Sequence, residues 1–272
     1  MIHTIIIGEN SNLSNILYKK IPNCSLISSR KLVQNINELG SFNNRRVNII
    51  FNNFQPAVKL NILENTSEYI SSAIVVTAKV LDYFDNSNIN KIIYTSSASV
   101  YGNNILCKES DELKPMNLHA SLKVSNEKLI AKYCLDNNID YSITRIFNMY
   151  GGNDNFSIIR KIINASLNNE KITIVNNGNA IRDFIHIDDV AEVYLNLLKL
   201  KNVRILNIGT GEGNSIKNIV DFLINKNITI DLNNIYRNEL KISTADNQLL
   251  MNLTNKNDFI KVEDYLRKEL NL

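Results

Sequence analysis

The stretch TIIIGENSNLSNILYKKI, residues 4–21, decides the fold of this chain. It opens with a short apolar run that ends in Gly8, which is typical of a buried β-strand followed by a turn. Leu13, Ile16 and Leu17 then recur at the spacing of one face of a helix. The stretch therefore predicts a strand, a tight turn and an amphipathic helix in direct succession.

The same alternation continues as far as Gly152. Further strands are predicted at 24–28, 47–51, 90–97 and 140–151, and further helices at 31–39, 66–84 and 117–137. Strands that alternate with helices indicate a parallel sheet covered by helices on both faces. We therefore predict an α/β fold with a Rossmann-type doubly wound parallel sheet.

Beyond Gly152 the alternation becomes less regular. Helices are predicted at 155–169, 188–200, 215–225 and 262–270, and strands at 171–175, 204–213 and near 228–232. No linker rich in Pro, Gly or Ser separates this part from the first. We expect a smaller α+β lobe packed on the sheet domain.

Composition narrows the class of protein. The 272 residues are 44% hydrophobic and carry a net charge of +3, which favours neither nucleic acid nor a membrane surface as a partner. The three cysteines are widely spaced, so neither a disulfide framework nor a metal site is expected. The apolar run at the N-terminus is too short for a signal peptide, and no long uncharged apolar span follows. We expect a cytoplasmic protein.

The turn after the first strand is a candidate phosphate site. Dinucleotide-binding folds place the pyrophosphate against a glycine-rich turn and the start of a helix. Here the spacing is Gly8-x-x-Ser11-x-x-Ser14, so only the first of three expected glycines is present. The serines are small and can donate hydrogen bonds, which keeps cofactor binding open beside the alternative of an ordinary tight turn.

The end of the second predicted strand bears on the choice of cofactor. An NAD site commonly has a carboxylate there for the ribose hydroxyls, but this chain has Ser28, Ser29, Arg30 and Lys31. Cations and serines suit a 2′-phosphate, which favours NADP(H) over NAD(H). The alternative is that Arg30 and Lys31 only begin a solvated helix.

Four further blocks of sequence resemble the motifs of a known protein family. They are SSASVYG (96–102), RIFNMYG (145–151), RDFIHIDDVA (182–191) and NIGTG (207–211). In order and spacing they resemble the extended short-chain dehydrogenase/reductase family, the NAD(P)-dependent nucleotide-sugar epimerases, dehydratases and reductases. The resemblance covers nearly the whole chain. It implies a dinucleotide-binding domain at 1–152 with about 183–210, and a substrate-binding lobe at 153–182 and 211–272.

The resemblance also implies roles for single residues. Ser97 resembles the hydroxyl that binds the reacting sugar oxygen, and Lys123 the lysine that bonds the nicotinamide ribose. Asn148 and Arg182 resemble residues that contact the diphosphate of a nucleoside diphosphate sugar. Asn53, followed by Phe54, stands where the family has small residues beside the cofactor. His186, Asp188 and Asp189 resemble a mainly structural block.

One position departs from the family. The usual catalytic Tyr lies four residues before the Lys, and this chain has His119 there. On a helix the two side chains share a face, so the charge of Lys123 should lower the pKa of His119. A neutral imidazole can donate a hydrogen bond to a developing alkoxide but is a poor base, which favours reduction over reversible epimerisation.

The loop after the fourth strand narrows the reaction further. Ala98 and Ser99 stand where a 4,6-dehydratase has an acidic pair, and Ser99 where a 3,5-epimerising reductase has a Cys. The leading prediction is NADPH-dependent reduction of a 4-keto (deoxy)sugar on a nucleoside diphosphate, for a surface glycan. The alternatives are a nucleotide-sugar 4-epimerase with bound NAD, and a catalytically silent relative. The family further implies a homodimer through helices 66–84 and 117–137.

Overall fold

The structure is a computed structural model, and it describes residues 2–53, 66–256 and 258–272, so Phe54 lies outside the described residues. The chain forms two compact units. The first unit consists of Met1–Val100, Pro115–Arg145 and Ala191–Leu206. The second unit consists of Tyr101–Lys114, Ile146–Val190 and Asn207–Leu272.

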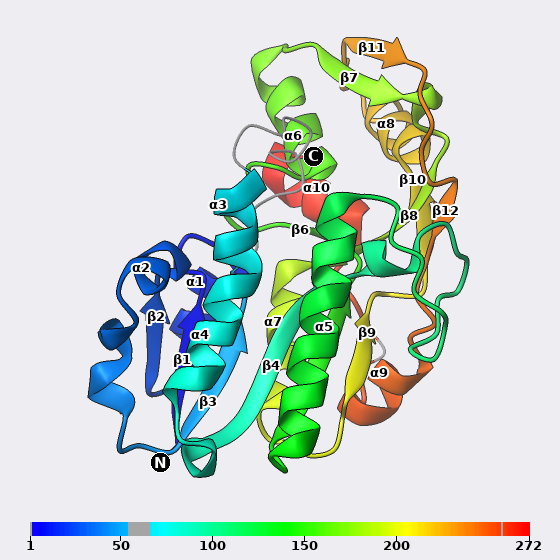
Figure 1. The fold of residues 1–272 in the computed structure, drawn as a ribbon. Coiled ribbons are helices and arrows are strands. Elements are labelled where there is room, and N and C mark those ends of the chain that lie inside the picture. The colour runs from blue at the N-terminus through cyan, green and yellow to red at the C-terminus, as the bar shows by residue number, and fades with distance from the viewer. Residues whose placement is uncertain (1, 54–65, 257) are drawn as a thin grey trace. The chain divides into compact units, whose positions relative to one another are not determined.

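A sheet in the order β2-β1-β3-β4-β5-β9 organises the first unit (Figure 1). Its strands are β1 (His3–Ile7), β2 (Cys24–Ile27), β3 (Val47–Phe51), β4 (Ile89–Ser97), β5 (Asp140–Ile146) and β9 (Ile205–Ile208). Neighbours from β2 to β4 pair in parallel; Ile5, for example, lies between Ser25 and Ile49. The chain changes direction between β1 and β3, and such switch points are where doubly wound sheets bind ligands.

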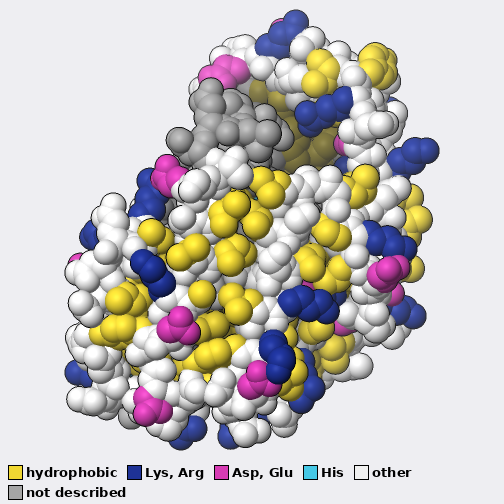
Figure 2. Space-filling view, in the orientation of Figure 1, with side chains coloured by type: hydrophobic (Ala, Val, Ile, Leu, Met, Phe, Trp, Pro, Cys, Tyr) yellow, Lys and Arg dark blue, Asp and Glu magenta, His cyan; other side chains and the backbone are white. Residues whose placement is uncertain are grey.

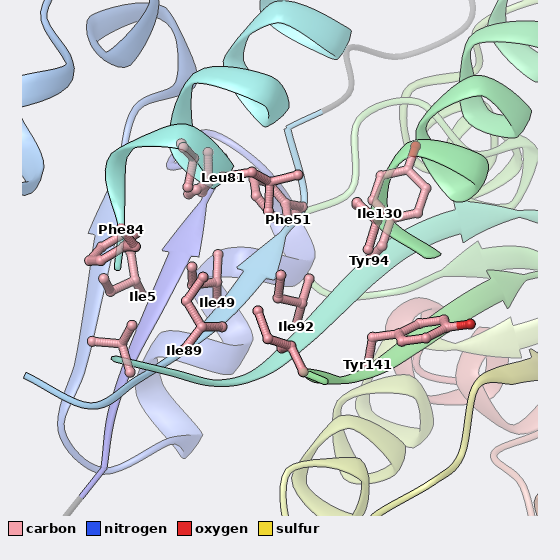
Figure 3. Packing of buried hydrophobic residues seen from close by; sticks show 14 of the residues in the cluster. Ile5, Ile49, Phe51, Leu81, Phe84, Ile89, Ile92, Tyr94, Ile130 and Tyr141 are labelled. Atoms are coloured by element: carbon pink, nitrogen blue, oxygen red, sulfur yellow. The ribbon is translucent and has the colours of Figure 1, made fainter. Parts of the chain in front are cut away.

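Helices cover both faces of this sheet. They are α1 (Asn12–Lys20), α2 (Ser29–Gln34), α4 (Val76–Tyr83), α5 (Leu118–Asp136) and α7 (Ile187–Leu197). Ile92 and Tyr94 of β4 pack in one buried cluster with Ile130 of α5 (Figure 3). The next side chain, Thr95, points to the other face and hydrogen-bonds Tyr194 of α7 at 2.7 Å. The Rossmann-type α/β fold is therefore confirmed.

The predicted helix 66–84 contains a wider turn. It runs as α3 (Thr66–Ile70), a π-helical segment (Ser71–Val75) and α4. The carbonyl of Ala73 within that segment accepts side-chain hydrogen bonds from Asn53 at 3.2 Å, Asn126 at 2.8 Å and Thr77 at 3.2 Å. Side chains that occupy a helical carbonyl in this way stabilise a π turn.

The second unit has a small sheet in which β8 is central. β8 (Ile181–His186) pairs with β6 (Asn148–Tyr150), β10 (Gly213–Ser215) and β12 (Ile242–Ser243). β7 (Ile172–Val175) pairs with β11 (Leu232–Ile235), and the helices are α6 (Ile158–Asn168), α8 (Ile216–Ile224), α9 (Gln248–Thr254) and α10 (Val262–Leu270). Short 3₁₀ turns occupy Ile36–Phe42, Asn86–Asn88, Ala98–Tyr101 and Asn176–Gly178.

Two sequence-based predictions of strands were wrong, and one strand was missed. The single strand predicted at 140–151 breaks at Phe147 into β5 and β6. The strand predicted near 228–232 lies at β11, because Ile228 and Ile230 pack into the hydrophobic core of the second unit before the strand begins. β8 was not predicted, since Arg182 and Asp183 interrupt its apolar pattern.

Along the described parts of the chain, no helix combines the length and the apolar character needed to cross a membrane.

The turn after β1 should tolerate no side chain at Gly8. Its φ is +123°, and a Cβ there would lie 2.0 Å from the Asn52 carbonyl oxygen. We expect Gly8→Ala to lower the free energy of unfolding by about 2 kcal/mol or more, seen as a fall of roughly 4–8 °C in Tm. Gly40→Ala is the control, because its Cβ would meet nothing closer than Tyr83 Oη at 3.8 Å. Equal Tm values for the two variants would contradict this reading of the turn.

Candidate active site

The candidate phosphate site lies where the carboxyl ends of β1 and β3 meet. The Gly8 N–H donates to the Ile27 carbonyl at 2.9 Å, and the Ser11 N–H donates back to the Gly8 carbonyl at 3.0 Å. The Asn52 N–H donates to the Ile7 carbonyl at 2.8 Å, which continues the pairing of β3 with β1 past the strand end. These bonds fix a tight turn at the switch point of the sheet.

The Asn52 side chain shapes this turn, and the sequence analysis missed it. Its amide donates to the hydroxyls of Ser11 at 2.7 Å and Ser14 at 2.8 Å, the two positions where glycines were expected. Ser14 is fully buried. Ser11 is the N-cap of α1, but its side chain caps no N–H of that helix. The start of α1 therefore has no side-chain cap from Ser11, and the turn fits a pyrophosphate at the positive end of the helix.

The other predicted cofactor residues take different positions. Ser29 and Arg30 begin α2 directly after β2, and the Arg30 side chain is exposed, with Nε 4.0 Å from Glu68. A contact at this distance between exposed groups contributes little and leaves the cation available. Asn53 is buried, and its amide bonds the Ala73 carbonyl, so it supports the scaffold under the site.

Ser97, His119 and Lys123 all belong to the first unit. Ser97 is the last residue of β4, and its hydroxyl accepts the Ser99 N–H at 3.2 Å. His119 and Lys123 lie in the first two turns of α5, which begins where the Asn117 side chain accepts the Ala120 N–H at 2.8 Å. The cap therefore sets where the His–Lys face of the helix starts.

Lys123 is buried against β4. Its ammonium donates to the Thr95 carbonyl at 2.5 Å and lies 5.2 Å from the centre of the Tyr94 ring. Only 4% of the residue is exposed. Burial lowers the pKa of Lys123 to about 7, against the opposing effect of Glu127. The lysine is therefore poised between its two protonation states near neutral pH.

A buried ion pair lies one turn further along α5. Glu127 accepts two hydrogen bonds from Arg145, Nη2 to Oε2 at 2.8 Å and Nε to Oε1 at 3.2 Å. The Ser96 hydroxyl also donates to Glu127 Oε1, at 2.5 Å. Both charged side chains are at most 4% exposed. This network joins α5, β4 and β5 directly beneath Lys123.

His119 stays neutral in this setting. Burial, followed by the charge of Lys123, lowers the pKa of His119 to about 3. Its imidazole then carries one N–H that can donate and one nitrogen that can accept. The predicted effect of Lys123 on His119 is confirmed, although burial is the larger cause.

Asn148 and Arg182 come together in the second unit. Asn148 lies on β6 and Arg182 on the parallel neighbour β8, where Asn148 is opposite Phe184. The Asn148 amide donates to the Asp183 carbonyl at 3.2 Å, and the Arg182 guanidinium donates to Glu239 at 3.3 Å. Burial lowers the pKa of Arg182 and Glu239 opposes this, so the guanidinium is held as a cation.

Asp183 is a further residue whose role the sequence did not reveal. Its carboxylate accepts the N–H of Thr210, Gly211 and Ala245 at 2.8–3.1 Å, and the Thr210 hydroxyl at 2.8 Å. Burial raises the pKa of Asp183, while these four donors oppose the rise. The carboxylate fixes the GTG turn after β9 to the strand that carries Arg182.

The remaining residues of that block make structural contacts. His186 accepts the Asp188 N–H at 3.2 Å, and Asp189 accepts the Ile260 N–H at 2.9 Å. Asp189 also pairs with Lys256 at 3.0 Å.

The family can now be stated. Residues 33–209 match the model of the NAD dependent epimerase/dehydratase family, so the chain belongs to that family. It is 34% identical to Protein CapI of Staphylococcus aureus over 55% of this chain and 49% of that protein. It is 29% identical to the UDP-glucuronate 4-epimerase of Thermodesulfobacterium geofontis over 77% of this chain and 67% of that protein. The chain thus spans about half to two thirds of these relatives.

Solved structures share the fold. MoeE5 in complex with UDP-glucuronic acid and NAD superposes with a TM-score of 0.87 over 99% of this chain and 98% of that one, at 19% identity.

The buried lysine should make stability depend on pH. Folded Lys123 has a pKa of about 7, against 10.5 for an ordinary lysine. Between these values the unfolded chain binds more protons, so the free energy of unfolding rises with pH. We expect a rise of about 2 kcal/mol between pH 7 and 9 in excess of that in Lys123→Met.

Lys128→Met, at an exposed position of the same helix, is the matched control and should keep the wild-type dependence. Because other groups also titrate in this interval, the readout is the difference between variants. A Lys123→Met curve parallel to the wild type would show that Lys123 has an ordinary pKa.

The Glu127–Arg145 pair should be costly to break. Glu127→Gln leaves the Arg145 charge buried, so we expect a loss of about 3–5 kcal/mol in the free energy of unfolding, measured with urea. The double variant Glu127→Met, Arg145→Met should lose less free energy of unfolding than Glu127→Met and Arg145→Met lose together as single variants. Asp136→Asn, which removes an exposed pair with Lys132, should cost at most about 0.5 kcal/mol. Additive losses would refute the coupling.

Proposed function

We propose that this member of the NAD dependent epimerase/dehydratase family reduces a 4-keto sugar carried on a nucleoside diphosphate. The observation that carries the proposal is a neutral His119 beside a buried Lys123, at the position of the family's catalytic Tyr and Lys. In this account the first unit binds the nicotinamide dinucleotide and the second unit binds the nucleotide sugar.

The turn after β1 supports the proposal that the first unit binds the dinucleotide. Gly8 and the uncapped start of α1 receive the pyrophosphate, and Lys123 holds the nicotinamide ribose. When bound, the nicotinamide supplies the hydride that reaches the carbonyl carbon. Asn52 keeps the Ser11 and Ser14 hydroxyls turned inward, which leaves backbone N–H groups to bind the phosphates.

The proton follows a separate route. The carbonyl oxygen becomes an alkoxide as the hydride arrives, and an imidazole N–H of His119 together with the Ser97 hydroxyl hydrogen-bonds it. The protonated form of Lys123 is the acid, because its pKa of about 7 matches neutral pH while that of His119 lies near 3. Proton loss from Lys123 balances proton gain at the alcohol oxygen.

A charged and a polar side chain of the second unit support the proposal that this unit binds the nucleotide sugar. Arg182 offers a planar guanidinium for the diphosphate, and Asn148 offers an amide from the adjacent strand. The solved relative MoeE5 binds UDP-glucuronic acid and NAD. Among nucleoside diphosphates, a UDP-sugar is therefore the first substrate class to test here.

A second candidate is a nucleotide-sugar 4-epimerase with bound NAD. A lysine with a pKa of about 7 can accept a proton as readily as it donates one, which suits oxidation followed by reduction. The relative from Thermodesulfobacterium geofontis carries the name of such an enzyme. The third candidate is a catalytically silent relative.

A homodimer and a cytoplasmic location belong to the same proposal. Hydrophobic side chains gather over α3 and α4 in Figure 2. Ile70, Val75 and Leu135 are 37–48% exposed on α3, the π segment and α5. These side chains suit pairing of the helices with those of a second copy.

The test supplies NADH or NADPH with UDP-linked 4-keto sugars and follows cofactor consumption and products. We expect a reduced product and a rate that falls as pH rises above 7, because Lys123 loses its proton. Lys123→Met and His119→Phe should each lower kcat by about 10²-fold or more. Ser125→Ala, an exposed position on α5, is the control.

Each other outcome has a separate meaning. A C4 epimer formed without net cofactor consumption identifies the epimerase. Failure to bind either cofactor at millimolar concentration contradicts both enzymatic readings. A rate that His119→Phe leaves unchanged places the imidazole off the proton path.

Cofactor choice has its own test. Arg30 is an exposed cation at the end of β2, which supports a preference for the 2′-phosphate of NADP(H). We expect Arg30→Ala to raise the Kd for NADPH by about tenfold and to leave the Kd for NADH unchanged, as fits the loss of one charge-assisted contact. Lys19→Ala, in the last turn of α1, should change neither value. Equal effects on both Kd values would show that Arg30 does not recognise the 2′-phosphate.

A further inference from the structure

A pocket lies in the first unit, at the end of the sheet opposite the turn after β1. It has a cavity volume of about 370 Å³ and is lined by His3, Asn23, Arg45 and Arg46. These residues stand at the amino ends of β1, β2 and β3, beside the N-terminus marked in Figure 1. β1 separates the pocket from Gly8 by about 16 Å, from the rise of a five-residue strand.

Hydrogen bonds hold the backbone around the pocket, while Asn23, Arg45 and Arg46 themselves are exposed. The His3 ring bonds the Ser25 hydroxyl at 3.0 Å and stacks on Phe42 with ring centres 5.1 Å apart. The His3 N–H donates to the Arg46 carbonyl at 3.4 Å, which ties the arginine loop to β1. Asn23 has a left-handed backbone, with φ of 51°, and its carbonyl accepts the Thr4 N–H at 2.9 Å. These contacts fix the backbone from which the side chains reach the pocket.

The charge of the lining has one sign. Within the described residues no carboxylate forms an ion pair with Arg45 or Arg46, and no acid lines the pocket. The pKa of His3 is lowered first by burial and then by Arg45, which places the imidazole beside a cation. Two arginines that are neighbours in sequence, an imidazole and an amide line the pocket, and their donors match the oxygens of a phosphate.

We propose that this pocket binds a small phosphorylated metabolite through Arg45 and Arg46, at a site separate from the dinucleotide. Its volume falls at the lower end of the range of small-molecule pockets, which suits a phosphomonoester and not a whole dinucleotide. His3 and Asn23 orient the ester from the β1 and β2 sides. The site does not rest on the proposed reaction, because it shares no residue with the Ser97, His119 and Lys123 group.

The test titrates the full chain with inorganic phosphate and with glycerol 3-phosphate, at fixed pH and at an ionic strength held with chloride. The readout is the ring signal of His3 in the NMR spectrum, identified by its loss in His3→Gln. We expect saturable shifts with a Kd of about 1 mM or tighter. In the double variant Arg45→Gln, Arg46→Gln, binding should be at least about tenfold weaker, because two charge-assisted contacts are lost. Saturating NADH or NADPH should not displace the ligand.

The matched control is Lys199→Gln, Lys201→Gln, which removes two exposed charges from the segment between α7 and β9. It should bind as the wild type does. An unchanged Tm in the arginine variant shows that the loop still folds. The proposal is overturned if the His3 signal does not saturate, if both double variants weaken binding equally, or if the cofactor competes.

Discussion

The buried carboxylate of Glu127 is the interaction on which the rest of the first unit depends. It holds Arg145 of β5 and Ser96 of β4 to α5, and its charge opposes the loss of the proton from Lys123. Without it Arg145 would lose the carboxylate that compensates its buried charge, and α5, which carries His119, would lose its links to β4 and β5 through Glu127. The geometry of the candidate site therefore depends on a buried pair of charges that lies one turn further along α5 than Lys123.

With His119 at the position of the family's tyrosine, we propose that Lys123 supplies the proton. The surroundings of α5 keep the imidazole neutral, because it lies in a half-buried position beside a lysine. The same burial brings Lys123 to the pKa range that acid catalysis needs at neutral pH. The two shifts have a common cause, desolvation near the start of α5, and the proposed reaction without a tyrosine depends on both.

Much of this architecture was predictable from local pattern. Short apolar strands and amphipathic helices place Gly8, Ser97 and Lys123 on the elements where they are found, because the periodicity of a buried strand or helix is a local property. Asn52, Glu127 and Asp183 were missed because their roles depend on partners far along the chain, such as Ser14, Arg145 and Thr210. β8 was missed for the same reason: its polar residues are buried only once its partner strands are in place.

The most direct test of the account is the protonation of Lys123 itself. NMR of the chain with isotope-labelled lysine side chains reports each ammonium separately as pH is raised. The account predicts one lysine signal with a midpoint near pH 7, and this signal should be lost in Lys123→Met. A spectrum in which every lysine titrates above pH 9 would contradict it.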